Sequence, residues 1–286
     1  MTVKTPLKWV GSKSKVMTEL KKFLPAGQRL VEPFGGSCAV MMATDYPAYL
    51  VADINSDLIN MYQQIQQHEN AFIALAAKLF AQFTTETDYY ALRNEFNNEP
   101  GMTLLYRAAV FLYMNRHGHR GMCRYNRNGH FNIPFGHYKK PYFPLEEIRA
   151  FAEKAKRATF ICAEFPKTLQ MVKPGDVVYS DPPYEGTFSD YHTEGFDLSM
   201  QSQLASLLER AAKTSPVIAS NSDTARTRCL YALFDTTTIS APRSLGFAAG
   251  EGKKASEIVA TLYPQHWIGF DLAAGEDNSA SFRVDA

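Results

Sequence analysis

Short apolar segments rich in valine, isoleucine and leucine recur at both ends of the chain, and helix-forming segments separate them. Residues 28–34, 48–53, 159–163, 176–180, 216–220 and 257–263 have the length and β-branched content of buried strands. Residues 144–158 and 198–213 repeat apolar side chains at helical spacing. This alternation predicts an α/β fold with an open, mostly parallel sheet and helices on both faces.

The alternation stops between the second and third predicted strands. Residues 56–114 have a helical pattern throughout, and a polar loop region with several glycines continues to Pro144. We therefore predict a small, mainly helical domain at 56–144, inserted into a discontinuous sheet domain of residues 1–55 and 145–270. Residues 271–286 are small and polar with few apolar side chains, so we expect a disordered tail.

Hydropathy and cysteine spacing exclude some classes of protein. The longest apolar run, from Ala108 to Met114, is much shorter than a membrane span, and the N-terminus has no hydrophobic signal region. The four cysteines lie tens of residues apart without a CxxC pair, which argues against a zinc site. We expect a cytoplasmic protein with reduced thiols, no membrane partner and no obligate protein partner.

Charge is unevenly distributed along the chain. The net charge is +1, but residues 101–145 contain no Asp or Glu. A solvated helix face normally mixes both signs, so a surface that binds a polyanion explains this stretch better. The same stretch carries seven of the chain's cations: Arg107, Arg116, Arg120, Arg124, Arg127, Lys139 and Lys140.

The tetrapeptide DPPY (Asp181, Pro182, Pro183, Tyr184) directly follows the predicted strand 176–180. Two prolines cannot continue a central strand, so the chain leaves the sheet here in an extended conformation. Asp181 and a proline carbonyl are then presented at the carboxyl end of a strand, where open α/β sheets bind ligands. An ordinary exit from a strand into a loop is the alternative.

A paired-glycine loop follows the first predicted strand. Phe34, Gly35 and Gly36 precede a short helical segment for which Ser37 could serve as N-cap. Asp53 comes 18 residues after Gly35, at the end of the next strand, where an acidic side chain can bind the ribose of a nucleoside cofactor. The alternative is that Asp53 caps the helix that begins near Ser56.

Six sequence blocks together resemble one family. LKWVGSKSK (7–15), VEPFGGS (31–37), ADINSDLI (52–59), the basic stretch 115–143, DPPY and SNSDT (220–224) occur in this order. Together they resemble the Dam-type DNA adenine-N6 methyltransferases of the D12 class, which methylate GATC in enterobacteria and their phages. The resemblance extends from about Leu7 to Tyr263, and it implies a Rossmann-like methyltransferase sheet with an inserted DNA-recognition domain.

The resemblance implies S-adenosylmethionine as methyl donor, S-adenosylhomocysteine as product, double-stranded DNA as partner, and no metal. Asp181 and the Pro182 carbonyl would accept the two N6 hydrogens of a flipped adenine, and Tyr184 would stack on its ring. The positions that match the family's cofactor residues are Trp9, Lys13, Phe34, Gly35, Gly36, Asp53 and Asp181. Trp9 could instead be a core aromatic.

For DNA, the resemblance and the basic stretch together single out Lys8, Arg116, His119, Arg120, Met122, Arg124, Asn126, Pro134, Tyr138 and Lys139. Arg124 is the expected guanine reader, because a bidentate Arg–guanine contact is the commonest specific one. His119 stands where close relatives carry a tyrosine, and it would be a smaller wedge beside a flipped base. Ser12 replaces a glycine of the family pattern.

Three functions fit these observations. The first is a site-specific adenine-N6 methyltransferase that acts on GATC. The second keeps the reaction but changes the target, to another adenine-containing site or to RNA. The third is a DNA-binding relative that has lost catalysis, against which the intact DPPY and FGG loops argue.

Overall fold

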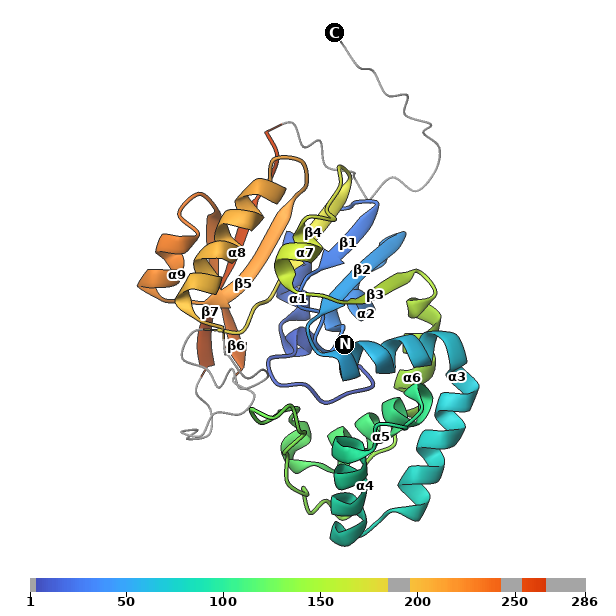
Figure 1. Cartoon of the computed structure of the whole chain (residues 1–286). Coiled ribbons are helices and arrows are strands. Elements are labelled where there is room, and N and C mark those ends of the chain that lie inside the picture. Colours follow the sequence, from blue (N-terminus) through green and yellow to red (C-terminus); the bar gives the residue numbers. More distant parts are fainter. Residues whose placement is uncertain (1–3, 185–195, 243–253, 266–286) are drawn as a thin grey trace.

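A computed structural model describes residues 4–184, 196–242 and 254–265. Its centre is one seven-stranded sheet in the order β3-β2-β1-β4-β5-β7-β6 (Figure 1). The first five strands of that order are parallel, and β7 runs antiparallel to both β5 and β6. The strands are β1 (Arg29–Glu32), β2 (Ala48–Asp53), β3 (Ala158–Cys162), β4 (Asp176–Ser180), β5 (Val217–Ser222), β6 (Asp235–Pro242) and β7 (Lys254–Leu262).

The sheet confirms the predicted α/β class and its mostly parallel strands. All six predicted strands form, but β6 is absent from the prediction. Its sequence, DTTTISAP, has no apolar run, and Ile239 is the one buried side chain among Asp235–Ser240. Because β6 is paired with β7 on one side, polar side chains are tolerated along it.

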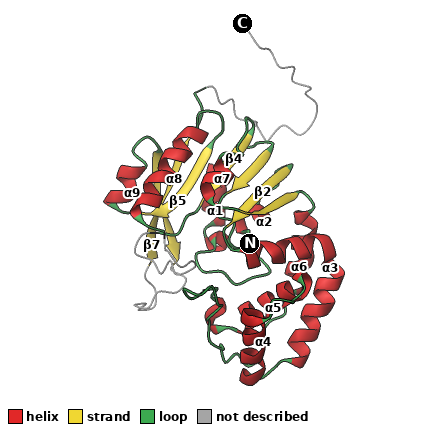
Figure 2. Ribbon diagram, viewed as in Figure 1, coloured by secondary structure: helices red, strands yellow, loops and turns green. Residues whose placement is uncertain are grey.

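Helices cover both faces of the sheet (Figure 2). Successive residues of β1, Leu30 and Val31, belong to two different apolar clusters, as the period of two along a strand requires. Val31 packs in the cluster that includes residues of α7 and α8, and Leu30 in the larger cluster that includes residues of α2, α3 and α6. The helices are α1 (Met17–Leu20), α2 (Ala39–Ala43), α3 (Ser56–Gln82), α4 (Glu86–Asn98), α5 (Leu104–His117), α6 (Leu145–Ala155), α7 (Phe165–Leu169), α8 (Leu198–Ala211) and α9 (Ala225–Leu230).

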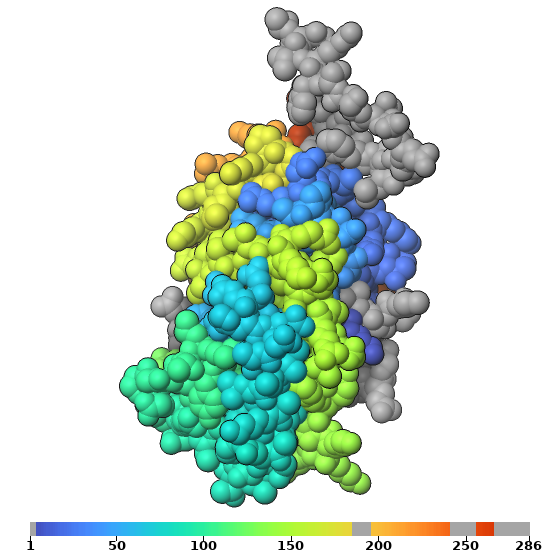
Figure 3. All heavy atoms as spheres, turned by 90° about the vertical axis from the view of Figure 1, so that its right-hand side faces the viewer, coloured from blue at the N-terminus to red at the C-terminus, as the bar shows by residue number. Residues whose placement is uncertain are grey.

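Three capped helices follow β2, where the sequence predicts a helical pattern. The side chain of Asn55 accepts from the Leu58 amide at the start of α3, Thr85 forms a capping box at α4, and Thr103 caps α5. These helices and the loop before α6 form the lower part of the molecule in Figure 1, and Figure 3 shows their cyan and green atoms from another side. Their apolar side chains, such as Phe72 and Phe111, belong to the same cluster as Leu30 of the sheet. The domain boundaries at residues 56 and 144 stay a prediction.

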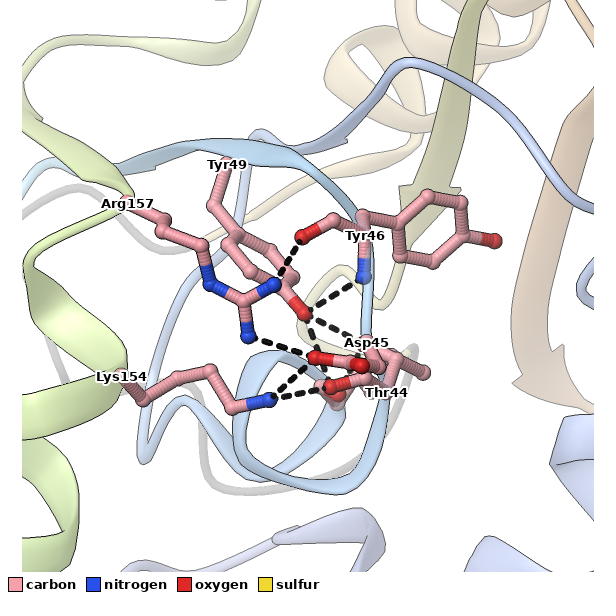
Figure 4. A network of polar contacts seen from close by, with 7 residues as sticks. Thr44, Asp45, Tyr46, Tyr49, Lys154 and Arg157 are labelled. Atoms are coloured by element: carbon pink, nitrogen blue, oxygen red, sulfur yellow. Dashed lines mark hydrogen bonds and ion pairs between the residues drawn. The ribbon is translucent and has the colours of Figure 1, made fainter.

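A polar network joins α6 to the loop before β2 (Figure 4). Lys154 and Arg157 both bind the Asp45 carboxylate, at 3.4 and 2.5 Å, and Lys154 also donates to the Thr44 carbonyl. The Arg157 guanidinium donates to the Tyr46 carbonyl as well. This network fixes the chain where it returns from the three helices to the sheet. No helix of the described ranges is long and apolar enough to cross a membrane. The predicted tail, 271–286, lies outside those ranges.

Candidate functional site

The strand order of the sheet reverses between β1 and β4. From β1 the chain crosses to β2 on one side, and from β4 it crosses to β5 on the other. In open α/β sheets such a switch point, at the carboxyl ends of the strands, is where ligands bind. The FGG loop follows β1 and the DPPY segment follows β4, so the two predicted motifs lie at the same edge of the sheet.

The FGG loop is fitted closely to its neighbours. A Cβ on Gly35 would lie 2.4 Å from Cγ1 of Val51, and Gly36 has a φ of +46°, with its missing Cβ 2.9 Å from Nε1 of Trp9. Both glycines are thus already required by protein contacts. The predicted cap at Ser37 is wrong: Cys38 stands at the N-cap of α2 without a side-chain bond, and the Ser37 hydroxyl donates to Ser12.

Asp53 joins the FGG loop to the start of α3. Its Oδ2 accepts the Gly36 amide and its Oδ1 accepts the Asn55 amide, each at 3.0 Å. Asn55, not Asp53, is the N-cap of α3, so the alternative in which Asp53 caps that helix is wrong. A carboxylate has about four acceptor positions, so these two backbone bonds do not exclude hydroxyl groups of a ligand.

Aromatic rings line the same edge. Phe34 stacks on Phe165 at 5.7 Å between centroids and meets Phe196 edge-on at the same distance. Phe165 stands at the start of α7, just after β3, and is absent from the predicted site. The sequence could have indicated Phe165, because it closely follows the predicted strand 159–163, just as Phe34 stands at the end of the predicted strand 28–34. Aromatic rings, an acidic side chain and backbone amides in this position fit an adenosine-containing cofactor.

Asp181 is held by two neighbours through one oxygen. The Lys13 ammonium lies 2.8 Å from Asp181 Oδ1, and the Tyr184 hydroxyl donates to the same atom at 3.1 Å. Lys13 is 6% exposed and Asp181 is 18% exposed, so this ion pair is largely shielded from water. No described residue forms a hydrogen bond with Oδ2 of Asp181. That oxygen is oriented by the pair and remains able to accept a hydrogen bond from a substrate amine.

The second proline of the DPPY segment is held by a side chain of α8 that is itself bound to β5. Pro182 is buried, and the Pro183 carbonyl accepts from Nε2 of Gln201 at 2.8 Å. Gln201 in turn accepts from Nδ2 of Asn221 on β5. Both amides are buried. Neither is in the predicted set, although Asn221 lies in the SNSDT block and was the signal that could have pointed to this support.

A second carboxyl group, that of Glu32, lies near Asp181. Glu32, the last residue of β1, is 2% exposed, and its Oε1 has no partner among the described residues. Burial, with a further contribution from the charge of Asp181, raises the pKa of Glu32 to about 8. Glu32 is therefore mostly protonated at neutral pH, and Asp181 carries the negative charge at this point of the edge.

The basic stretch forms a small hairpin beside α4. Tyr125 and Phe131 face each other in an isolated antiparallel bridge, and Asn126 closes the turn by accepting the amides of Asn128 and His130. The side chain of Arg124 donates through Nε to Asn132 at 2.8 Å. We define residues 122–132 as the recognition hairpin.

Lys8 links the N-terminal segment to this part of the molecule. Its backbone exchanges two hydrogen bonds with the Asn115 side chain, which also donates to the Gly121 carbonyl. The ammonium of Lys8 lies 4.1 Å from the centre of the Tyr138 ring. Burial and the nearby Arg116 lower the pKa of Lys8. Lys8 and Tyr138, predicted from distant parts of the sequence, are therefore neighbours.

The remaining DNA-binding candidates differ in exposure. His119, Arg120, Pro134 and Lys139 are exposed, and Met122 is partly buried against the core. Arg116 is 6% exposed, and its guanidinium donates to the carbonyls of Thr5 and Pro6. Those bonds hold the N-terminal segment in place. A contact between Arg116 and DNA stays a prediction.

Comparison with known proteins gives consistent matches over nearly the whole chain. The sequence profile of the D12 class of N6 adenine-specific DNA methyltransferases matches residues 9–245. The retron Ec67 DNA adenine methylase of Escherichia coli is 59% identical over 281 residues, which cover 98% of this chain and 99% of that protein. The DNA adenine methylase of Serratia marcescens is 43% identical over 264 residues, covering 89% and 96%. That of Escherichia coli K12 is 40% identical over 265 residues, covering 90% and 95%.

Proposed function

The chain belongs to the D12 class of N6 adenine-specific DNA methyltransferases, and we propose that it methylates N6 of adenine in GATC, with S-adenosylmethionine as the methyl donor and the target base turned out of the duplex. The observation that carries this proposal is the geometry of Asp181, whose Oδ1 is anchored by Lys13 and Tyr184. The other oxygen is directed by the same contacts and can accept one N6 hydrogen.

The residues at this edge could compensate for the weak nucleophilicity of the adenine amino group. The lone pair of adenine N6 is delocalised into the ring, which makes the nitrogen a poor nucleophile. Hydrogen bonds from N6 to Asp181 Oδ2 and to the Pro182 carbonyl would draw the nitrogen toward tetrahedral geometry and stabilise its developing positive charge. S-adenosylmethionine supplies an activated methyl group on a positively charged sulfur. One N6 proton then leaves by way of the Asp181 carboxylate to water.

The cofactor would lie against the FGG loop and Asp53, which are hydrogen-bonded to each other. Asp53 can accept ribose hydroxyls, and the partly exposed ring of Phe34, which is backed by the buried Phe165, offers an apolar surface for a purine. Tyr184 would leave its present bond to Asp181 or rotate about it to stack on the flipped adenine. These assignments rest on the match to the family together with the position of each residue at the switch point.

Sequence recognition is proposed for the recognition hairpin and its neighbours. Arg124 would read guanine in the major groove, and Lys8 and Tyr138, which are already in contact, would lie near the bases. The exposed Lys139 would contact phosphate, as would Arg120. The exposed His119 would take the position of a wedge beside the flipped base.

Methyl transfer from labelled S-adenosylmethionine tests this function. Duplex DNA is incubated with the full chain, digested to nucleosides and examined for N6-methyladenine, and the modified positions are mapped by sequencing. We expect label in N6-methyladenine at GATC. Label at another adenine-containing site, or in RNA in place of DNA, would overturn the target, and no transfer to any nucleic acid would overturn the reaction.

A further inference from the structure

Glu257 lies at the catalytic edge although it belongs to neither motif. It comes from β7, where it pairs with Ser222 at the end of β5, and it stands beyond the residues that the family profile matches. The Tyr184 hydroxyl lies 3.1 Å from Glu257 Oε2 as well as 3.1 Å from Asp181 Oδ1. The Lys13 ammonium lies 3.7 Å from the same Glu257 oxygen. Glu257 therefore shares both of the partners that hold Asp181.

The charges of this cluster do not cancel. Lys13 contributes one positive charge, while Asp181 and Glu257 are two carboxylates that are 18% and 14% exposed. The third carboxyl nearby, Glu32, is mostly protonated because of its burial. The ionised cluster thus has a net charge of −1 in a place with little access to water.

One carboxylate is enough to neutralise the charge of Lys13. Asp181 already pairs with the ammonium at 2.8 Å, and a further buried carboxylate adds desolvation and repulsion from Asp181. Both effects raise the pKa of Glu257, and Lys13 offsets them in part. Desolvation and repulsion both disfavour this extra negative charge, and a cation that enters the site would neutralise it.

We propose that Glu257 supplies the negative charge that complements the cationic sulfur of S-adenosylmethionine, so that the site binds the methyl donor in preference to its product, in which the sulfur is neutral. The inference rests on the proposed function, because it assumes S-adenosylmethionine as donor. Glu257 acts at a distance, as an electrostatic partner of the donor and through Lys13 and Tyr184, and not as a group that touches the reacting atoms.

The reaction itself makes this charge useful. The N6 lone pair forms the new C–N bond, the electrons of the S–C bond remain on sulfur, and the positive charge passes from sulfur to N6. One N6 proton then leaves through Asp181 to water, so that neither the sulfur nor N6 carries a charge in the products. The net −1 cluster favours the charged donor and the charged transition state, and it loses its attraction for the product when the sulfur becomes neutral.

The expected size of the effect follows from the spacing. The two bonds through Tyr184, a hydrogen bond from N6 to Asp181 and a reacting distance of about 3 Å together place the sulfur on the order of 10–15 Å from Glu257. At that separation, removing one charge changes affinity for a cation by about tenfold at the effective dielectric of a protein.

The test compares binding of S-adenosylmethionine and S-adenosylhomocysteine by isothermal titration to the full chain and to its Glu257→Gln variant. Glutamine keeps the size and the acceptor oxygen but removes the charge. We expect the variant to lose about tenfold in affinity for S-adenosylmethionine and much less for S-adenosylhomocysteine. Glu153→Gln, which removes an equal charge from the surface of α6, should leave the ratio of the two affinities unchanged.

The Glu257→Asp variant distinguishes loss of the charge from a disturbance of the fold. It shortens the side chain but keeps the charge, so both affinities can fall while their ratio stays near that of the unmodified chain. Equal losses for both ligands in Glu257→Gln, or an equal change of ratio in Glu257→Asp, would overturn the inference. If the unmodified chain binds neither ligand, the proposed function fails first, and that outcome is distinct from an unchanged ratio.

Discussion

The edge that carries Asp181 and the hairpin that carries Arg124 are held in different ways. At the edge, functional side chains follow strands, and Asp181 is fixed by a buried ion pair with Lys13. The recognition hairpin has a single bridge, and helix α4 replaces a neighbouring strand: Asn97 both accepts from and donates to the backbone of Phe131. The proposed catalytic residues are thus placed by the backbone ladder of the sheet, and the proposed recognition residues by a short hairpin and its side-chain contacts with α4.

This difference predicts how each region responds to substitution. A change at the edge should alter the rate or the binding of cofactor on every DNA sequence. A change in the hairpin should alter the choice among sequences, because its side chains are the proposed contacts with base edges. The predictions below test that division, beginning with the largest effect.

Replacement of Asp181 should produce the largest effect. Asp181→Ala removes the acceptor for N6, and we expect methylation to fall by about 10³-fold or more, equivalent to ~4 kcal/mol of transition-state stabilisation. DNA affinity should stay within a few-fold, because the side chain faces the edge of the sheet and not the hairpin. Single-turnover rates and DNA titrations measure the two quantities. A variant that methylates at near the original rate would remove Asp181 from the mechanism.

Glu32 links the same edge to pH. Its pKa is raised to about 8 in the folded chain, so above its unfolded value of about 4.5 the unfolded state gains charge more readily than the folded one. The free energy of unfolding should therefore fall as pH rises from about 4.5 to about 8, by roughly 4 kcal/mol from this group alone. Glu32→Gln should abolish that part of the slope. Denaturant unfolding at pH 5 and pH 8 measures it, and parallel slopes for both proteins would contradict the assignment.

Asp53 should affect the cofactor and not the choice of sequence. Asp53→Ala removes the acceptor of the Gly36 and Asn55 amides and of the proposed ribose hydroxyls, so we expect S-adenosylmethionine binding to weaken by about 2 kcal/mol. The ratio of rates on GATC and on altered sites should stay constant. Thermal unfolding of the same variant controls for a loss of the fold. An unchanged dissociation constant would leave Asp53 with only its backbone role.

Lys139 should give the smallest effect. It is exposed, and loss of one phosphate contact should weaken GATC and unrelated duplexes alike, while the slope of log affinity against log salt changes by about one unit. Lys167→Ala, which removes a cation from α7, serves as the control and should leave that slope unchanged. A loss confined to GATC would show that Lys139 reads bases.

The sequence allowed more to be predicted at the edge than at the hairpin. Asp181 and Asp53 were singled out because each lies at the carboxyl end of a predicted strand, and the resemblance to the family then supplied their roles. The pairing of Asp181 with Lys13 joins residues far apart in the sequence, and no local pattern encodes it. Glu257 was missed because it is the first residue of a predicted strand. The periodicity of the sequence does not reveal that this strand runs antiparallel to β5, which brings Glu257 to the same edge as Asp181.

The acid-free stretch 101–145, which contains the hairpin, shows the limit most clearly. Its acid-free composition indicated a surface for a polyanion, but composition does not distinguish a cation that faces outward from one that supports the fold. Arg116 donates to the Pro6 carbonyl, and Arg107 binds the buried carboxylate of Asp57, which also accepts from Tyr125. Arg107 and Arg116 thus support the fold, and only the packing of the helices reveals that role.

The most direct test of the division between the two regions compares Arg124→Ala with Asp181→Ala on one set of duplexes. Methylation rates are measured on GATC and on duplexes altered at one base pair, at two salt concentrations. We predict that Arg124→Ala loses about 1–3 kcal/mol on GATC and much less on the duplex altered at the guanine it reads, so that discrimination falls. Asp181→Ala should lower every rate by the same factor. A uniform loss for Arg124→Ala would contradict the account, and the guanine reader would then be sought at Lys8 or Arg120.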